Sequence, residues 1–363
     1  MSAIQKIFQT YGPQYLALYA HRMPQIHKKA IQDIMDCRSG AFGAIAYGCH
    51  DCRTIQFIAC CCGNRHCPTC QHDKTDQWLS KQMEKLLPIH YFLLTITLPQ
   101  GLRQVARSHQ KIAYAALFSC AHKALRKLAR DKRFIGSTQI GYLAVLHTWG
   151  NMLQYHPHLH LVIPGGALSE KKDQWLSSRQ DLFVHTKPLA HIFRAKFRDA
   201  MKKAQLFDKI DPFVWKQKWV TDSRAVGKGQ NSLRYLSRYV FRVAISNHRI
   251  KSIENGIIKF QYKDRQKKTW KTTALDATEF MRRFLQHVLP KGLMKIRHYG
   301  FLNPNSSVSI EKICELISLI HDVIRDLLPE IPEHKNKGIK CACCGNELKF
   351  MALLKLPRWG PPG

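Results

Sequence analysis

The residues HPHLHLVI at positions 156–163 combine three histidines with an apolar run. In a β-strand, residues two apart lie on the same face. His158 and His160 can therefore bind one ion side by side, while Leu159 and Leu161 turn to the opposite face and into a core. Taken alone, the alternation also fits two structural histidines. The stretch predicts a core strand with a candidate metal site on its other face.

A second strand is expected just before this one, over residues 140–148. If residues 142–149 run antiparallel to 158–164, His147 comes to lie next to His158 and His160. Three imidazoles would then hold an ion and leave positions open for substrate, as in catalytic rather than structural sites. His156 is the rival third ligand and Gln154 a weaker one, and His147 also fits a packed strand histidine.

The charge of the chain indicates the kind of partner. The 363 residues include 57 Lys and Arg against 25 Asp and Glu, a net charge of +32 that is spread along the sequence. Contacts of Lys and Arg with closely spaced phosphates release counterions and so raise affinity. Nucleic acid is therefore the expected partner. The sequence has no uninterrupted apolar run near the length of a membrane span and no signal-peptide core, so we expect no membrane partner and a cytoplasmic location.

The 13 cysteines are clustered, which in a reducing compartment indicates metal rather than disulfides. The CxxC pairs Cys49/Cys52 and Cys67/Cys70 each offer two thiolates, and together they predict a structural zinc ion. Three nearby residues are candidates for extra ligands or for a second zinc: Cys37, Cys62 and His66. The run at 341–344 resembles half a zinc knuckle that either borrows ligands from elsewhere or carries free thiols. Arg65 would be available to DNA.

The segment RYLSRYVFR at 234–242 carries the candidate nucleophiles. On a helix, Tyr235 and Tyr239 lie four residues apart and leave the same face. Arg234, Arg238 and Arg242 form a parallel basic ridge that suits phosphates. A tyrosine that attacks a phosphodiester forms a covalent phosphotyrosine. Without the histidine site this face would be read as core packing; with it, we interpret the tyrosines as catalytic.

These motifs together resemble one known family. The matching stretches are CGNRHCPTCQ (62–71), HTWG (147–150), HPHLH (156–160), YLSRYVFRVAISNHR (235–249), FLQHVLPKG (284–292) and IRHYGF (296–301). Their order and content resemble the two-tyrosine (Y2-type) rolling-circle transposases of bacterial insertion sequences, members of the HUH endonuclease superfamily that carry an N-terminal zinc-binding domain. The match spans most of the chain.

The resemblance implies an α+β fold, in which an HUH domain with a central antiparallel sheet flanked by helices accompanies the small zinc-binding module. It implies Mg²⁺ or Mn²⁺ at His158 and His160, with His147 as the third ligand inferred from the hairpin. Imidazole-rich sites suit softer metals, so the identity of the ion comes from the resemblance. Tyr235 and Tyr239 become the nucleophiles, and Arg249 ends a matching stretch as a further candidate for DNA contact.

The activity so implied is nicking and rejoining of single-stranded DNA at element ends through a 5′-phosphotyrosine, with a 3′-OH released. Partners are the single-stranded ends and the target DNA, in a bacterial cytoplasm and at the nucleoid. The expected domains are a helical segment at 1–36, a zinc-binding module at 37–88, a catalytic domain at 89–302 with a helical insertion at about 166–225, and a C-terminal helix with a basic, Cys-containing tail at 303–363.

Three alternatives stay open at this point. A plasmid replication initiator or relaxase of the same superfamily would use the same active site, although the zinc module favours a transposase. A non-catalytic zinc-finger DNA-binding protein would need neither the tyrosine pair nor the histidine strand. A transposase of the carboxylate type needs three convergent acids, and the 25 acidic residues offer no persuasive set.

Overall fold

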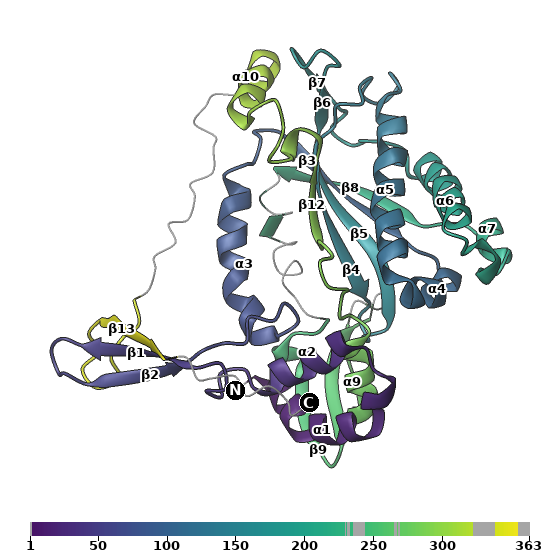
Figure 1. Cartoon of the computed structure of the whole chain (residues 1–363). Coiled ribbons are helices and arrows are strands. Elements are labelled where there is room, and N and C mark those ends of the chain that lie inside the picture. Colours follow the sequence, from purple (N-terminus) through teal and green to yellow (C-terminus); the bar gives the residue numbers. More distant parts are fainter. Residues whose placement is uncertain are drawn as a thin grey trace. The chain divides into compact units, whose positions relative to one another are not determined.

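A computed structural model of the chain describes residues 2–228, 230, 233–234, 244–264, 267, 269–321 and 338–354. The chain divides into two compact units (Figure 1). Unit 1 comprises Met1–Gln77, Phe241–Val288 and Pro332–Gly363, and unit 2 comprises Trp78–Val240 and Leu289–Ile331. Among the described residues, no helix is both long and apolar enough to cross a membrane.

Unit 2 is built on a five-stranded antiparallel sheet in the order β12-β4-β5-β3-β8. Its strands are β3 (His90–Thr97), β4 (Tyr142–Trp149), β5 (Tyr155–Pro164), β8 (Thr221–Lys228) and β12 (Ile296–Tyr299). The predicted α+β class with a central antiparallel sheet is confirmed. In the register, His158 lies opposite His147 on β4 and opposite Thr97 on β3.

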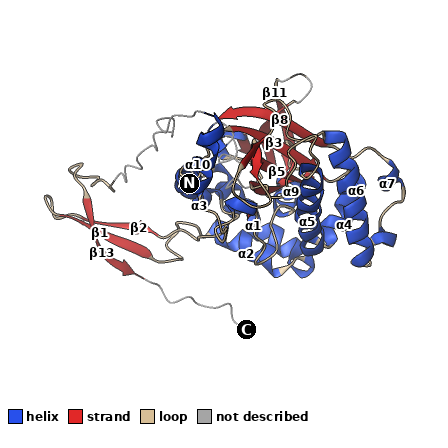
Figure 2. Ribbon diagram, turned by 90° about the horizontal axis from the view of Figure 1, so that it is seen from above, coloured by secondary structure: helices blue, strands red, loops and turns tan. Residues whose placement is uncertain are grey.

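One face of this sheet, which we call the core face, is apolar and covered by helices (Figures 1 and 2). The helices are α4 (Arg103–Ser108), α5 (Gln110–Ala129) and α6 (Thr186–Lys203), and η2 (Gln100–Leu102) precedes them. Leu159 and Leu161 of β5 are buried there with Phe193 and Phe197 of α6. Each such side chain stabilises the fold by about 1.5–3 kcal/mol. Because strand residues alternate, the histidines lie on the other face, which we call the histidine face.

The segment expected as a helical insertion at about 166–225 is only partly helical. It begins with the paired strands β6 (Gly166–Leu168) and β7 (Trp175–Ser177), continues through α6, η3 (Phe207–Lys209) and α7 (Phe213–Lys216), and ends in β8. β8 pairs with β3 at the edge of the sheet. Its sequence TDSRAVGK lacks an apolar period, because an edge strand does not need two buried faces.

Unit 1 contains a helical layer on a second sheet. The helices are α1 (Ala3–Tyr19), η1 (Ala20–Arg22), α2 (Gln25–Met35) and α9 (Ala277–Leu285), and the sheet is β9 (Ile250–Glu254), β10 (Ile257–Lys263) and β11 (Trp270–Asp276), preceded by η4 (Asn247–Arg249). Phe284 meets Phe8 of α1 at 5.0 Å between ring centroids. Residues 241–288 therefore group with the N-terminal helices and not with the catalytic domain that was expected to span 89–302.

A third sheet in unit 1 joins distant parts of the chain. Its strands are β1 (Ala44–Cys49), β2 (Ile55–Ala59) and β13 (Leu348–Leu354), in the order β13-β1-β2. Cys49 pairs with Leu348, so part of the expected C-terminal tail is instead a strand of the zinc-binding module. The remaining elements are α3 (Pro68–Met83), η5 (Gly300–Leu302) and α10 (Ile310–His321).

Candidate active site and metal centres

The histidine face brings three imidazoles together. His147, His158 and His160 each offer a ring nitrogen within 4.8 Å of the others. The ring centroids of His147 and His160 are 4.8 Å apart, and those of His158 and His160 are 4.9 Å apart. The hairpin register that the sequence predicts is confirmed, because His147 stands directly opposite His158. The structure thus places these three predicted residues at one point of the sheet.

The backbone and one neighbouring strand orient two of these rings. The Nδ1–H of His158 donates to the carbonyl oxygen of His156 at 2.7 Å. A neutral His158 therefore carries its lone pair on Nε2, the nitrogen suited to a metal. Nδ1 of His160 lies 3.1 Å from Oγ1 of Thr95 on β3. Thr95 is a contributor that the sequence did not single out, because only the sheet register brings it beside His160.

The two rival ligands are engaged elsewhere. The guanidinium of Arg103 donates to Nδ1 of His156 at 2.7 Å, and burial lowers the pKa of Arg103. Oε1 of Gln154 accepts from the backbone N–H of Met152 at 2.9 Å and closes the turn before β5. His156 does not belong to the cluster of the three histidines. His156 contributes its carbonyl to His158, and Arg103 fixes the His156 ring.

An aromatic ring and a cation flank the cluster. Trp149 stacks on His147 at 5.0 Å between centroids with an interplanar angle of 27°. Nζ of Lys295 lies 4.7 Å from the centroid of the Trp149 ring. The peptide N–H of Leu146 donates to the Lys295 carbonyl, which ties this segment to β4. A positive charge is thus fixed close to the histidines, where a phosphate would be attracted.

The donor set fits a divalent ion with open coordination positions. Three imidazole nitrogens, with one ring orientation set by a protein carbonyl, match the ligand number of catalytic rather than structural sites. Nitrogen ligands favour a transition metal such as Mn²⁺ over Mg²⁺. The arrangement can hold an ion and still admit oxygen atoms of a substrate.

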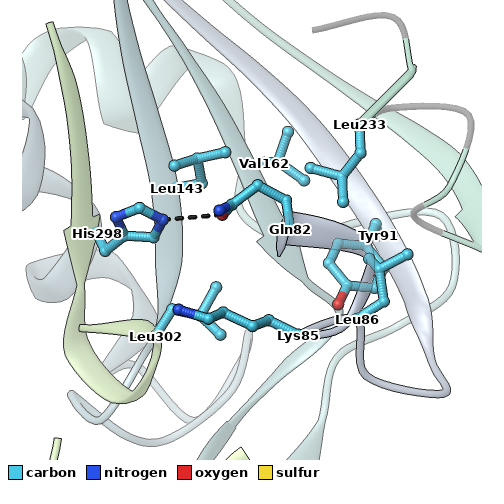
Figure 3. A pocket seen from close by; sticks show the side chains of 9 residues that line it. All are labelled: Gln82, Lys85, Leu86, Tyr91, Leu143, Val162, Leu233, His298 and Leu302. Carbon is cyan, nitrogen blue, oxygen red and sulfur yellow. Dashed lines mark hydrogen bonds between the residues drawn. The ribbon is translucent and has the colours of Figure 1, made fainter. Parts of the chain in front are cut away.

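A small pocket lies further along the histidine face (Figure 3). Val162, two residues past His160, lines it together with Tyr91 and Leu233, and its volume is about 20 Å³, room for about one water. His298 bonds Gln82 across the pocket at 2.9 Å, and burial lowers the pKa of His298. Leu233 is 4% exposed and precedes Tyr235 by two positions.

The tyrosine motif itself is described only at its first residue. Arg234 is exposed, as expected of a residue that contacts DNA. The other predicted residues of the motif, Tyr235, Tyr239, Arg238 and Arg242, lie outside the described residues. Their roles as nucleophiles and phosphate contacts stay predictions.

The first cysteine cluster lies in unit 1 and consists of Cys37, Cys62, Cys67 and Cys70. The Sγ atoms of Cys37 and Cys62 lie 3.6 and 3.5 Å from that of Cys70. These distances match the edge of about 3.8 Å expected for four thiolates around zinc with bonds of about 2.3 Å. His66, which the sequence offers as a further ligand, is buried but does not belong to the cluster.

The second cluster consists of Cys49, Cys52, Cys341 and Cys344. Sγ of Cys49 is 3.4 Å from that of Cys344, and Sγ of Cys52 is 3.5 Å from that of Cys341. Hydrogen bonding to Thr54 lowers the pKa of the Cys52 thiol to about 6, toward the thiolate that binds metal.

This arrangement corrects the prediction that the two N-terminal CxxC pairs share one ion. Cys49/Cys52 and Cys67/Cys70 belong to different clusters, because β13 brings the C-terminal cysteines to β1. Cys341 and Cys344 are themselves a CxxC pair, so the second half of that site is visible in the sequence once a distant partner is allowed.

The remaining predicted DNA contacts differ in exposure. Arg249 is only 7% exposed; its Nε donates to the Gln261 carbonyl at 2.6 Å and its guanidinium lies over Phe260. It packs within unit 1, so we no longer count it among the DNA contacts. Arg65 is half-buried, and burial lowers its pKa. Arg65 stays a candidate.

Comparisons with known proteins agree with this architecture. The family model described as "Putative transposase" (Y2_Tnp) matches residues 141–309, and the "Transposase zinc-binding domain" (Zn_Tnp_IS91) matches residues 7–98. A Sinorhizobium fredii protein named "Putative transposase y4qJ" is 36% identical, over 82% of this chain and 80% of the relative. The transposase for insertion sequence element IS801 of Pseudomonas savastanoi pv. phaseolicola is 26% identical, over 91% of this chain and 84% of the relative.

No solved structure was found to match the chain. The first family model covers the histidine hairpin and the tyrosine motif, and the second covers the N-terminal cysteines of both clusters. The chain therefore belongs to the Y2-type transposases of the IS91 and IS801 kind, with their N-terminal transposase zinc-binding domain.

Proposed function

We propose that this transposase nicks and rejoins single-stranded DNA at the ends of its element by metal-dependent attack of a tyrosine. The observation that carries the proposal is the three-histidine cluster on the histidine face, with Leu233 buried further along the same face. Leu233 precedes Tyr235 by two positions. Because Tyr235 follows this buried anchor by only two residues, little chain separates it from the face that would hold the ion.

His147, His158 and His160 would hold Mg²⁺ or Mn²⁺. When bound, the ion would polarise the scissile phosphate and stabilise the charge of the leaving oxygen. The carbonyl of His156 and Thr95 would keep the His158 and His160 rings in place. Lys295, fixed over Trp149, would attract the phosphate toward the histidines.

The chemical step is a transesterification. The hydroxyl oxygen of Tyr235 or Tyr239 forms a bond to phosphorus, and the bond from phosphorus to the 3′ oxygen breaks. The tyrosine loses its proton to solvent, the leaving oxygen gains one, and the products are a 5′-phosphotyrosine and a 3′-OH. The phosphotyrosine retains the energy of the broken bond, so a second strand end can be joined without another energy source. A second tyrosine would allow a second transfer.

The test is formation of a covalent adduct. Purified protein is incubated with Mn²⁺ and a labelled single-stranded oligonucleotide that carries the element's terminus, and the products are separated under denaturing conditions. We expect a protein–DNA band that is absent in the Tyr235→Phe/Tyr239→Phe double variant and present in Tyr262→Phe, a tyrosine outside the site. If the wild type forms no adduct with its own ends, the chain acts instead as a zinc-dependent DNA-binding protein.

A further inference from the structure

A basic groove lies between α5 and α6 in unit 2, on the helical layer that covers the core face. Its volume is about 520 Å³. Three of its lining residues are lysines: Lys123 from α5, and Lys196 and Lys203 from α6. The floor consists of small side chains, mostly alanines of both helices. Nothing in the proposed catalytic site uses this groove.

The charge of this layer is one-sided. α5 has the sequence QKIAYAALFSCAHKALRKLA, with four basic residues and no acid, and α6 has six basic residues against Asp199 alone. Asp199 lines the groove and lies 3.9 Å from the guanidinium of its neighbour Arg198. Within the described part of the chain, no ion pair neutralises Lys123, Lys196 or Lys203. Burial raises the pKa of the Cys120 thiol to about 11, so the floor adds no negative charge.

We propose that this groove binds the phosphate backbone of duplex DNA, as a second DNA-binding surface on the opposite side of the sheet from the histidine face. Lys196 and Lys203 are seven positions apart, which is about 10 Å along a helix. A duplex presents a phosphate on each strand for about every 3.4 Å of axis, so two lysines reach separate phosphates. The alanine floor leaves room for the backbone to approach.

The chemistry of the groove favours positioning over sequence readout. Lysine is a compact, mobile charge that contacts any phosphate, whereas base recognition needs hydrogen-bonding side chains that reach a groove edge. The proposal rests on the proposed function only in assigning the nicked strand to the histidine face. A second surface would let one molecule hold duplex DNA while its active site is occupied by a single strand.

The test compares two triple variants with equal loss of charge. Lys123→Gln/Lys196→Gln/Lys203→Gln empties the groove of lysines, and Lys171→Gln/Lys209→Gln/Lys218→Gln removes three exposed lysines elsewhere in unit 2. Affinity for a labelled duplex of arbitrary sequence is measured between about 50 and 200 mM salt. The slope of log K against log salt is negative, and we expect it to become shallower by about 2 to 3 in the groove variant. In the control variant it should become shallower by less than about 1.

A variant that binds duplex DNA more tightly cannot be explained by misfolding, so it complements the loss of binding expected of the groove variant. Asp199→Asn removes the negative charge from the groove and should raise duplex affinity several-fold. Adduct formation on a single-stranded end, measured in parallel, should be the same in all variants. The proposal is overturned if the groove and control variants lose equal slope, or if Asp199→Asn leaves duplex affinity unchanged. Absence of any adduct would count against the proposed function and not against the groove, since duplex binding is measured without it.

Discussion

The histidine cluster and the cysteine clusters differ in how far apart their ligands lie in the sequence and in how many ligands they provide. The three histidines come from one hairpin, within fourteen positions of each other, and leave part of an ion's coordination shell open. The second cysteine cluster joins Cys49 to Cys344, which are 295 positions apart, and provides four thiolates, enough to close the coordination shell. The difference fits the proposal that the cysteines hold the fold together and that the histidines act on the DNA substrate.

The same difference decides what the sequence could predict. The β4–β5 hairpin is local, so alternation of apolar residues and histidines is enough to place His147 opposite His158. The partner of Cys49 and Cys52 depends on β13, which lies about 300 positions away. Local periodicity carries no information about such pairing, and the nearer CxxC pair was chosen in its place.

Other failures have the same physical origin. β8 pairs only on one side, so its charged and small residues show no strand period, and it was predicted as part of a helical insertion. Arg249 lies in a stretch that matches the family, but the motif does not report that its guanidinium is buried over Phe260. Thr95 and Arg103 reach the histidine hairpin only through tertiary contacts.

The largest expected effect comes from the histidine site. His158→Ala should reduce nicking of single-stranded ends at least about 100-fold, because the metal's stabilisation of the transition state amounts to several kcal/mol. DNA binding at low salt should persist, since it depends on distributed charge. His191→Ala, an exposed histidine of α6, is the matched control. Equal loss of nicking and binding in His158→Ala would indicate a structural histidine.

The next expected effect concerns the two cysteine clusters. The purified chain should contain two zinc ions by elemental analysis, and both should resist a chelator that removes the ion from the histidines. Cys341→Ser and Cys37→Ser should each lower the zinc content by about one ion, because each cluster needs four thiolates.

Cys61→Ser controls for the loss of a cysteine, because Cys61 is exposed, adjoins Cys62 and belongs to neither cluster. It should retain both ions. Full zinc content in Cys341→Ser would contradict the two-cluster account. It would favour the single zinc site made of Cys49, Cys52, Cys67 and Cys70.

The smallest expected effect comes from the residues that orient the histidines. Thr95→Val keeps the shape of the side chain and removes the hydroxyl that lies 3.1 Å from His160. Loss of such a contact typically costs about 10- to 100-fold in metal affinity. The Mn²⁺ concentration for half-maximal nicking should therefore rise, while the rate at saturating Mn²⁺ changes little.

Thr97→Val on the same strand face provides the comparison for this shift. Its Mn²⁺ dependence should stay near that of the wild type. If Thr95→Val instead lowers the saturated rate and leaves the Mn²⁺ dependence unchanged, Thr95 acts in the chemical step and does not merely position His160.

The central claim is that a tyrosine following Leu233 attacks DNA at the three histidines, and peptide mapping of the adduct tests it most directly. Trypsin cuts after Arg234, Arg238 and Arg242, so Tyr235 and Tyr239 fall on separate peptides, 235–238 and 239–242. We predict that mass spectrometry of the digested wild-type adduct finds the nucleotide on one of these peptides, and that His158→Ala yields neither. A nucleotide on any other peptide, or an unchanged yield in His158→Ala, would contradict the account.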